Sequence, residues 1–489
     1  MSTDEHGVVF PLSGEGRRST TSVGRAVAAD ALRTADPTGA RHAEQETGWR
    51  SGYLLHFRRL VEAGLASREA SLGIATAGLG SLRSRMRVLD ESGDERTLEE
   101  WATSEPMQHL ETVTVTGTGD PERDLSLPFH GQRLRGDALL ERLDAWVAAG
   151  VLEPSASVAV RTVMANPDWL RLEGRTVVVL GAAAEMGPLQ ALLRWGARVA
   201  AVDLPRPELW ERLARTAGSG AGTLLVPTRP GGAEALEQRA GTDLIAGVPG
   251  VAGWLADLPG PLVLGNYVYA DGATNVRLSV AVDALTTRLQ DTRDDLALAF
   301  LATPTDVFAV PREAVEQATR NYEQRSGTAR LLGRPLRAAS AGRLLRRAYV
   351  PDADPGINDS LVAQQGPNYA LAKRLQRWRA AVARDAGATV SLNVAPPTRT
   401  RSVVKNRALA AAYAGAHRFG VEVFEPATAN VLMATLLVHD LHTGGGPAHA
   451  HPWQDEAYAA VHGGLWRSAY APRSALGLAA LLGYGAARG

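Results

Sequence analysis

The stretch GRTVVVLGAAAEMG, residues 174–187, decides the fold of this chain. Its run 176–180 is short, β-branched and apolar throughout, as in a strand that is buried on both faces of a parallel sheet. Gly181 ends the run, a helix is expected after the turn, and a second apolar run over 198–202 leads to Asp203. This order of strand, glycine turn, helix, strand and acid predicts a βαβ unit whose turn binds a dinucleotide pyrophosphate and whose acid binds the adenosine ribose.

Strand and helix patterns continue to alternate after this unit. Further strands are predicted over 223–227, 262–267, 296–301 and 389–394, and helices over 208–217, 275–290, 368–385 and 431–441. Such alternation implies parallel strands joined by right-handed helical crossovers. We therefore expect residues 171–489 to form a Rossmann-like, doubly wound catalytic domain of the α/β class. An arginine-rich stretch, 311–366, interrupts the pattern and is interpreted as a solvated insertion, with a docking face for an anionic group as the alternative.

The chain before residue 171 has a different pattern. Residues 1–48 contain few large apolar side chains and are predicted to form a mobile tail. Residues 49–170 show apolar side chains at three-to-four spacing, which predicts a mainly helical N-terminal domain with one strand at 112–116. This domain is interpreted as a structural cap, and a lid over the active site is the alternative.

Composition excludes several classes of function. The net charge of zero gives no bulk attraction to nucleic acid or to an anionic membrane. The absence of cysteine excludes disulfides, thiolate metal sites and cysteine nucleophiles. No apolar run is long enough to span a bilayer and the polar N-terminus has no secretory h-region, so a cytoplasmic protein is expected. The histidines at 439, 442, 449 and 451 lack carboxylates at a metal-binding spacing, so no metal is expected.

The two lysines differ from every other basic residue of the chain. Of 52 lysines and arginines only Lys373 and Lys405 are lysines, which makes each a candidate for a role that arginine cannot fill. Tyr369 lies four residues before Lys373, on the same face of a helix. A nearby ammonium favours the phenolate and lowers the phenol pKa, so this pair can donate or accept the proton of a carbonyl/alcohol couple. A surface aromatic–cation pair without function is the alternative.

With these motifs the chain resembles the short-chain dehydrogenase/reductase superfamily over about 175–442. The turn glycines match the two ends of the family's Thr-Gly-x-x-x-Gly-x-Gly loop, Tyr369 and Lys373 match its Tyr-x-x-x-Lys, and 393–396 matches its Asn-x-x-Pro-Gly turn. The resemblance implies hydride transfer between NAD(P) and a carbonyl or alcohol, with Tyr369 as acid/base and Lys373 tuning it. The cofactor contacts that it implies are Gly181, Ala183, Glu185, Met186, Gly187, Asp203, Asn266, Lys373, Pro396 and Thr398.

Several positions depart from the family pattern. Glu185 stands at the middle glycine of the loop, which places a carboxylate near the expected pyrophosphate. The family's catalytic serine is absent, so Thr303 or Thr305 is expected to hold the substrate oxygen, although both lie far before Tyr369 in the sequence. Asn275 is a candidate for the family's proton-relay asparagine. These departures leave two alternatives open, a catalytically silent nucleotide-binding protein and a non-redox lyase or epimerase on the same fold.

The cofactor and the partners follow less directly. Asp203 favours the ribose diol of NAD, whereas Arg206 could bind the 2′-phosphate of NADP, so NAD is expected and NADP stays open. The substrate is expected to be a small molecule, and the arginine-rich insertion would suit an anionic or carrier-bound one. The resemblance also implies a homo-oligomer.

Overall fold

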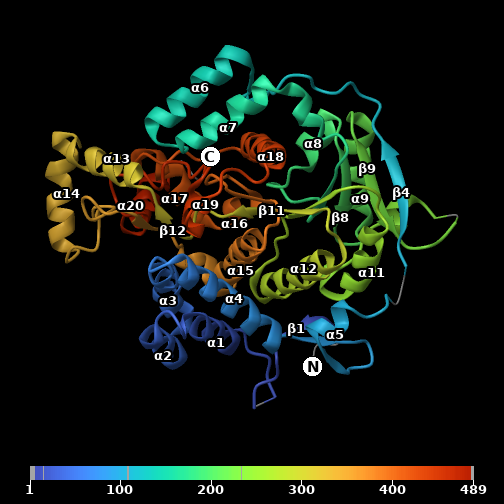
Figure 1. Ribbon diagram of the computed structural model, residues 1–489. Coiled ribbons are helices and arrows are strands. Elements are labelled where there is room, and N and C mark those ends of the chain that lie inside the picture. The colour runs from blue at the N-terminus through green and yellow to red at the C-terminus, as the bar shows by residue number, and fades with distance from the viewer. Residues whose placement is uncertain (1–5, 15, 107–108, 233, 486–489) are drawn as a thin grey trace.

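A seven-stranded sheet forms the centre of the computed structural model, which describes residues 6–14, 16–106, 109–232 and 234–485 (Figure 1). Its strands are β4 (Glu111–Thr116), β7 (Thr176–Leu180), β8 (Arg198–Val202), β9 (Thr223–Thr228), β10 (Leu262–Asn266), β11 (Leu296–Ala302) and β14 (Val390–Val394). The order across the sheet is β14-β11-β10-β7-β8-β9-β4. All neighbours pair in parallel except β4, which runs antiparallel to β9. The predicted α/β class is confirmed, and the order is compatible with a Rossmann-like fold.

Strand β7 shows why the sheet is covered on both faces. Val177 and Val179 pack into one hydrophobic core, whereas Val178 and Leu180 pack into the other. Successive side chains of a strand point to opposite faces, so an apolar run without alternation needs helices on both sides. The predicted burial of this strand is therefore confirmed.

Helices cover both faces of the sheet. On one face lie α11 (Leu244–Ala256), α12 (Gly272–Thr292) and α15 (Gly366–Asp385), together with α1 (Thr20–Leu32), α3 (Trp49–Gly64) and α4 (Arg68–Arg85). On the other lie α6 (Gly136–Ala149), α7 (Pro154–Ala165), α8 (Leu189–Trp195), α9 (Pro207–Ser219) and α18 (Pro426–His442). None of the helices in the described ranges is long and apolar enough to cross a membrane.

The N-terminal part differs from the prediction. Where a mobile tail is expected, α1 and α2 (Pro37–Gln45) form helices with buried faces. The buried face of α1 consists mostly of alanine and valine with Leu32 as its one large apolar side chain, so its apolar pattern is weak in the sequence. Helices α1, α3 and α4 pack against α15, and β4 joins the central sheet. A separate N-terminal helical domain is therefore not confirmed.

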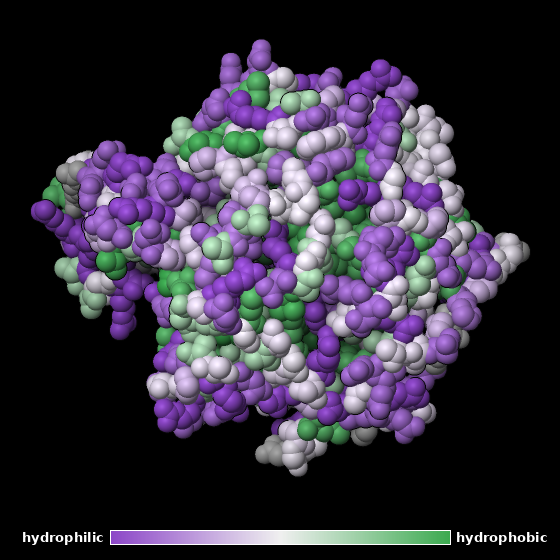
Figure 2. All heavy atoms as spheres, in the orientation of Figure 1, coloured by the Kyte–Doolittle hydropathy of each residue, from purple (hydrophilic) through white to green (hydrophobic). Residues whose placement is uncertain are grey.

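The arginine-rich insertion projects from the molecule. Helices α13 (Arg312–Glu323) and α14 (Gly327–Ala339) form a lobe that is mostly hydrophilic on the face shown in Figure 2. Strands β12 (Val307–Val310) and β13 (Gly356–Asp359) pair at its base. Within it the guanidinium of Arg325 lies 3.3 Å from the ring centre of Tyr322, and Arg347 pairs with Glu323 at 2.7 Å. Docking of an anionic group on this lobe stays a prediction.

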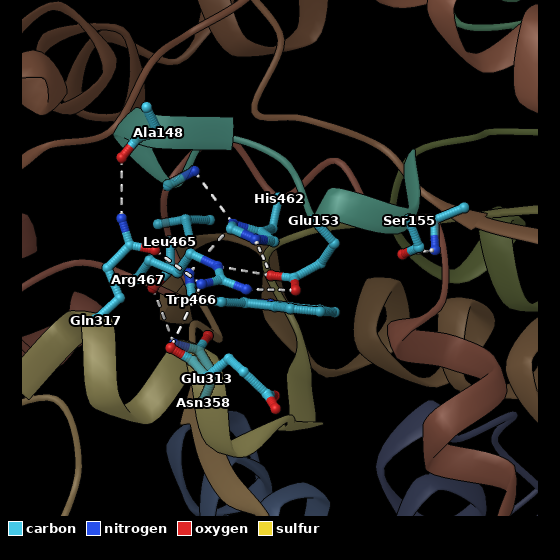
Figure 3. A network of polar contacts seen from close by, with 12 residues as sticks. Ala148, Glu153, Ser155, Glu313, Gln317, Asn358, His462, Leu465, Trp466 and Arg467 are labelled. Carbon is cyan, nitrogen blue, oxygen red and sulfur yellow. Dashed lines mark hydrogen bonds and ion pairs between the residues drawn. The ribbon is translucent and has the colours of Figure 1, made fainter. Parts of the chain in front are cut away.

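A buried ionic network fastens α7 to the C-terminal part of the chain (Figure 3). Glu153, which precedes α7, accepts hydrogen bonds from His462 Nε2 at 2.9 Å and from Arg467 Nη2 at 2.6 Å. Arg467 also donates to Gln317 of α13 at 2.7 Å. These two partners hold the pKa of Glu153 at about 2 although its burial alone would raise it. The network therefore joins three segments that lie far apart in the sequence.

Candidate functional site

A cavity of about 780 Å³ lies at the carboxyl ends of β7, β10, β11 and β14. This edge of a parallel sheet is where α/β proteins bind their ligands, because the connecting loops converge there. The cavity is lined by the loops after these four strands and by side chains of α15, including Ala184, Glu185, Met186, Tyr267, Tyr269, Thr303, Thr305, Tyr369, Lys373, Pro396 and Thr398. Tyr369, Lys373 and Thr303 therefore meet at one cavity.

The glycine turn follows β7 as predicted. Gly181 has a φ of +80°, and a Cβ there would lie 3.0 Å from the carbonyl oxygen of Tyr267. Both features favour glycine, because other residues are strained at this φ and the neighbouring backbone is close. The helix expected after the turn is α8, which begins at Leu189, two residues after Gly187. Of the predicted turn contacts, Glu185 and Met186 line the cavity, whereas Gly181, Ala183 and Gly187 lie behind them.

Asp203 binds the turn with one carboxylate oxygen and the backbone that follows β8 with the other. Its Oδ2 accepts a hydrogen bond from the backbone N–H of Ala183, and its Oδ1 accepts one from Leu204, each at 2.8 Å. Burial raises the pKa of this carboxyl above its ordinary value. Asp203 does not line the 780 Å³ cavity. Its observed contacts order the loop after β7, and the predicted contact with a ribose stays a prediction.

Glu185 contacts a residue that the sequence analysis does not identify. Its Oε2 accepts a hydrogen bond from the backbone N–H of Arg401 at 2.8 Å, and its Oε1 lies 3.1 Å from the Arg401 Nε. Arg401 begins α16 (Arg401–Lys405), so this pair bridges the cavity between the turn and the segment after β14. The carboxylate that departs from the family pattern is thus balanced by a cation from across the cavity.

Tyr369 forms the polar centre of the cavity with two threonines. The Thr303 side chain interacts with the Tyr369 phenol, and the Thr303 and Thr305 hydroxyls lie 2.9 Å apart. Burial raises the pKa of Tyr369 to about 12 and outweighs the interaction with Thr303, which lowers it. The predicted lowering of this pKa by Lys373 is therefore wrong for the structure described here.

The ammonium of Lys373 donates to two neutral acceptors, one of them on strand β11 of the sheet. Its Nζ donates to the Leu301 carbonyl at 3.3 Å and to Gln376 Oε1 at 3.1 Å. Gln376 in turn donates to Asn266 Oδ1 at 3.2 Å. Burial lowers the pKa of Lys373 to about 8. Asn266, predicted as a cofactor contact, does not line the cavity and is linked to Lys373 through Gln376. Gln376 is a residue that the sequence analysis does not identify.

A second buried ionic network, centred on Asp306, lies next to the threonines of the cavity. Asp306 Oδ1 accepts from Arg374 at 2.6 Å, and Asp306 Oδ2 accepts from Arg377 at 2.7 Å. Arg377 also binds Glu456. Arg374 and Arg377 belong to α15, as do Tyr369 and Lys373, and Asp306 directly follows Thr305. The network therefore fixes the threonine loop against the helix that carries the Tyr–Lys pair.

Other predicted candidates lie away from the cavity. The Asn393 amide donates to Asp440 at 3.1 Å, and Asn275 Oδ1 accepts from the Ala270 N–H at 3.1 Å, so both amides serve structural contacts. The ring of His442 stacks on Trp169 with 4.5 Å between the ring centres. Across the part of the chain that the structure describes, no three histidine or acidic side chains gather as a metal site would require.

Comparisons with known proteins give no relative. No family model matches the chain, and no curated protein matches its sequence at a significant level. The resemblance to the short-chain dehydrogenases/reductases therefore rests on the motifs alone.

Proposed function

We propose that the chain is an NAD(P)-dependent oxidoreductase, similar to the short-chain dehydrogenases/reductases, that transfers hydride between nicotinamide and a carbonyl or alcohol. The observation that carries the proposal is that Thr303 and Tyr369 interact in a cavity that Lys373 and the loop after β7 also border. A phenol and a hydroxyl side by side can share one substrate oxygen.

The residues around the cavity fit a dinucleotide. Its volume of about 780 Å³ lies within the ~300–1,000 Å³ typical of ligand sites. The loop after β7 would hold the pyrophosphate, and the ion pair of Glu185 with Arg401 reduces the repulsion that a lone carboxylate would cause there. Bound nicotinamide would supply the hydride donor or acceptor. We favour NAD over NADP because Asp203, close behind the turn, repels a 2′-phosphate.

The chain's own groups would handle the proton. The Thr303 hydroxyl donates a hydrogen bond to the substrate oxygen, and the Tyr369 phenol donates its proton to the same atom as the carbonyl becomes an alcohol. A phenol with a pKa of about 12 is protonated at neutral pH. The raised pKa thus supports carbonyl reduction as the favoured direction.

A second candidate is a nucleotide-binding protein without turnover. The loop carboxylate of Glu185 and the absence of the family's catalytic serine favour it, because both positions depart from the pattern of the active family members.

Tyr369→Phe tests the proposal. We expect this variant to lose about 10²–10⁴-fold in kcat, the usual contribution of a general acid, while NAD(H) or NADP(H) still raises its melting temperature. Tyr458→Phe removes the same hydroxyl outside the cavity and is expected to keep full activity. Turnover that survives in Tyr369→Phe contradicts the assignment. Cofactor binding without turnover over a panel of carbonyls and alcohols favours the second candidate.

A further inference from the structure

A smaller, apolar chamber adjoins the 780 Å³ cavity. It has a volume of about 80 Å³ and shares Thr305, Pro397 and Tyr413 with the larger cavity. Its other walls come mainly from α17 (Arg407–Gly415), η3 (Ala416–Phe419) and α20 (Pro472–Gly483). We propose that this chamber receives a short alkyl group of the substrate. The inference rests on the proposed function and specifies its substrate class.

The position of the chamber points to the substrate as its occupant. Thr305 borders both spaces, and its hydroxyl is 2.9 Å from that of Thr303, which interacts with Tyr369. No residue of the described glycine turn 181–187 lines the chamber. A group inside it therefore extends from the reacting centre toward the side opposite the pyrophosphate.

Three of the polar side chains in the chamber walls are already paired. The Ser360 hydroxyl donates to Asn358, the Ser468 hydroxyl donates to the Phe419 carbonyl at 3.0 Å, and Arg473 binds Asp359 at 2.8 Å. The remaining walls are mostly alanine, valine, leucine and proline side chains, with Phe419 among them. Such a surface favours an apolar group, and the Tyr413 phenol stands where the chamber borders the larger cavity.

The volume limits the length of the alkyl group. A cavity of ~150 Å³ is known to hold benzene, which has six carbon atoms. By proportion, the 80 Å³ of this chamber holds roughly three or four carbons. The expected substrate is therefore a ketone or secondary alcohol with an aliphatic arm of propyl or butyl size on one side of the reacting carbon.

A homologous series of methyl ketones tests this inference. We expect kcat/KM to rise about fourfold for each methylene that enters the chamber, as burial of a methylene predicts, and to stop rising beyond butyl. Ala412→Leu fills the chamber from α17 and is expected to abolish the rise. Leu476→Ala enlarges it and is expected to shift the limit to longer chains. Ala408→Leu adds the same volume on the exposed part of α17 and is the matched control.

Calorimetric titration of the same ketones onto the full-length protein separates this inference from the proposed function. If the wild type is active but its kcat/KM does not depend on chain length, the assignment of the chamber to an alkyl group is wrong, whereas the proposed oxidoreductase function stands. Binding that grows with chain length and is lost in Ala412→Leu supports the chamber even in a protein without turnover. A flat series in both measurements overturns the chamber. Melting curves show that the Ala412→Leu and Leu476→Ala variants are folded, and their opposite effects cannot both come from misfolding.

Discussion

Both lysines of the chain line the 780 Å³ cavity. Lys373 is buried there beside Gln376, whereas Lys405 lies exposed at the end of α16. Their rarity in the sequence is a usable signal, because a chain that uses arginine elsewhere keeps lysine at two positions of one site. The rarity of lysine does not reveal the orientation of the Lys373 ammonium, because that depends on its hydrogen bond to Gln376, one turn further along α15.

Lys373→Met is expected to raise stability at neutral pH. Burial lowers the folded-state pKa of Lys373 from 10.5 to about 8, so its charge opposes folding below pH 8, and this opposition fades as the pH rises from 8 to 10.5. The variant should gain about 2 kcal/mol at pH 7, since relief of the buried charge exceeds the loss of its two hydrogen bonds. Near pH 10.5 the variant should not have a higher free energy of unfolding than the wild type.

Urea denaturation of the wild type and the variant across this pH range measures the difference. Lys405→Met, at the exposed lysine, is the control and should not change stability. A Lys373→Met variant less stable than the wild type at pH 7 would show that the ammonium supports the fold. If Lys373→Met is more stable but loses turnover, the buried lysine is kept for function at the expense of stability.

The remaining site residues show where reasoning from the sequence ends. Spacing alone brings Tyr369 and Lys373 together, because four residues make about one helical turn. Thr303 is predicted from its place after a strand, and it contacts the phenol. The partners of Glu185 and Asp203 could not be predicted, since a contact with Arg401 across a cavity or with the backbone of a turn leaves no periodic trace in the sequence.

At the scale of elements, α15 is the support of the site. Of its apolar positions at helical spacing, Leu371, Leu375 and Trp378 are buried and Val382 is partly buried, but Arg374 and Arg377 are buried as well. Periodicity assigns charged residues to a solvated face, and here they are paired with acids inside the protein. The strands of the sheet were predictable because each is a short apolar run between turn residues.

Asp306→Asn is expected to weaken both the fold and the site. It leaves the buried guanidinium of Arg374 without its carboxylate and that of Arg377 with Glu456 alone, and breaking a buried pair typically costs about 3–5 kcal/mol. It also loosens the loop that carries Thr303 and Thr305, so kcat should fall more than the melting temperature alone explains. Chemical denaturation and steady-state kinetics measure the two effects. Asp385→Asn, which removes an exposed ion pair at the end of α15, is the control and should lose less than about 1 kcal/mol. Equal losses in the two variants would contradict the role given to Asp306.

At the scale of the whole molecule, the chain before residue 171 is part of the same core as the sheet. The burial of the small residues in α1 and the pairing of the predicted strand β4 with β9 depend on long-range packing, which the local pattern does not encode. The sequence separates 1–48 and 49–170 by composition, whereas the structure joins both to α15 and the sheet.

Glu153→Gln tests the network that fastens α7 to the C-terminal part. The folded-state pKa of Glu153 is about 2, below its ordinary 4.5, so the carboxylate contributes stability above pH 4.5 that is lost as the pH falls toward 2. Burial also lowers the pKa of His462, which weakens the network in acid in the same direction. The variant should be less stable by about 3 kcal/mol at pH 7, and the difference should shrink between pH 4.5 and 2.

Thermal unfolding from pH 7 downward follows this difference, with Glu141→Gln on the exposed surface of α6 as the control. A deficit that is constant with pH would mean that the carboxylate charge has no part in holding these segments together.

A crystal structure with bound NAD⁺ tests the central claim most directly, through the distance from the nicotinamide C4 to the Tyr369 hydroxyl. Our account predicts that the ring lies in the 780 Å³ cavity, with room between C4 and the phenol for one substrate carbon and its oxygen at contacts of about 3–3.5 Å. Nicotinamide bound outside this cavity, or separated from Tyr369 by protein atoms, would contradict the account.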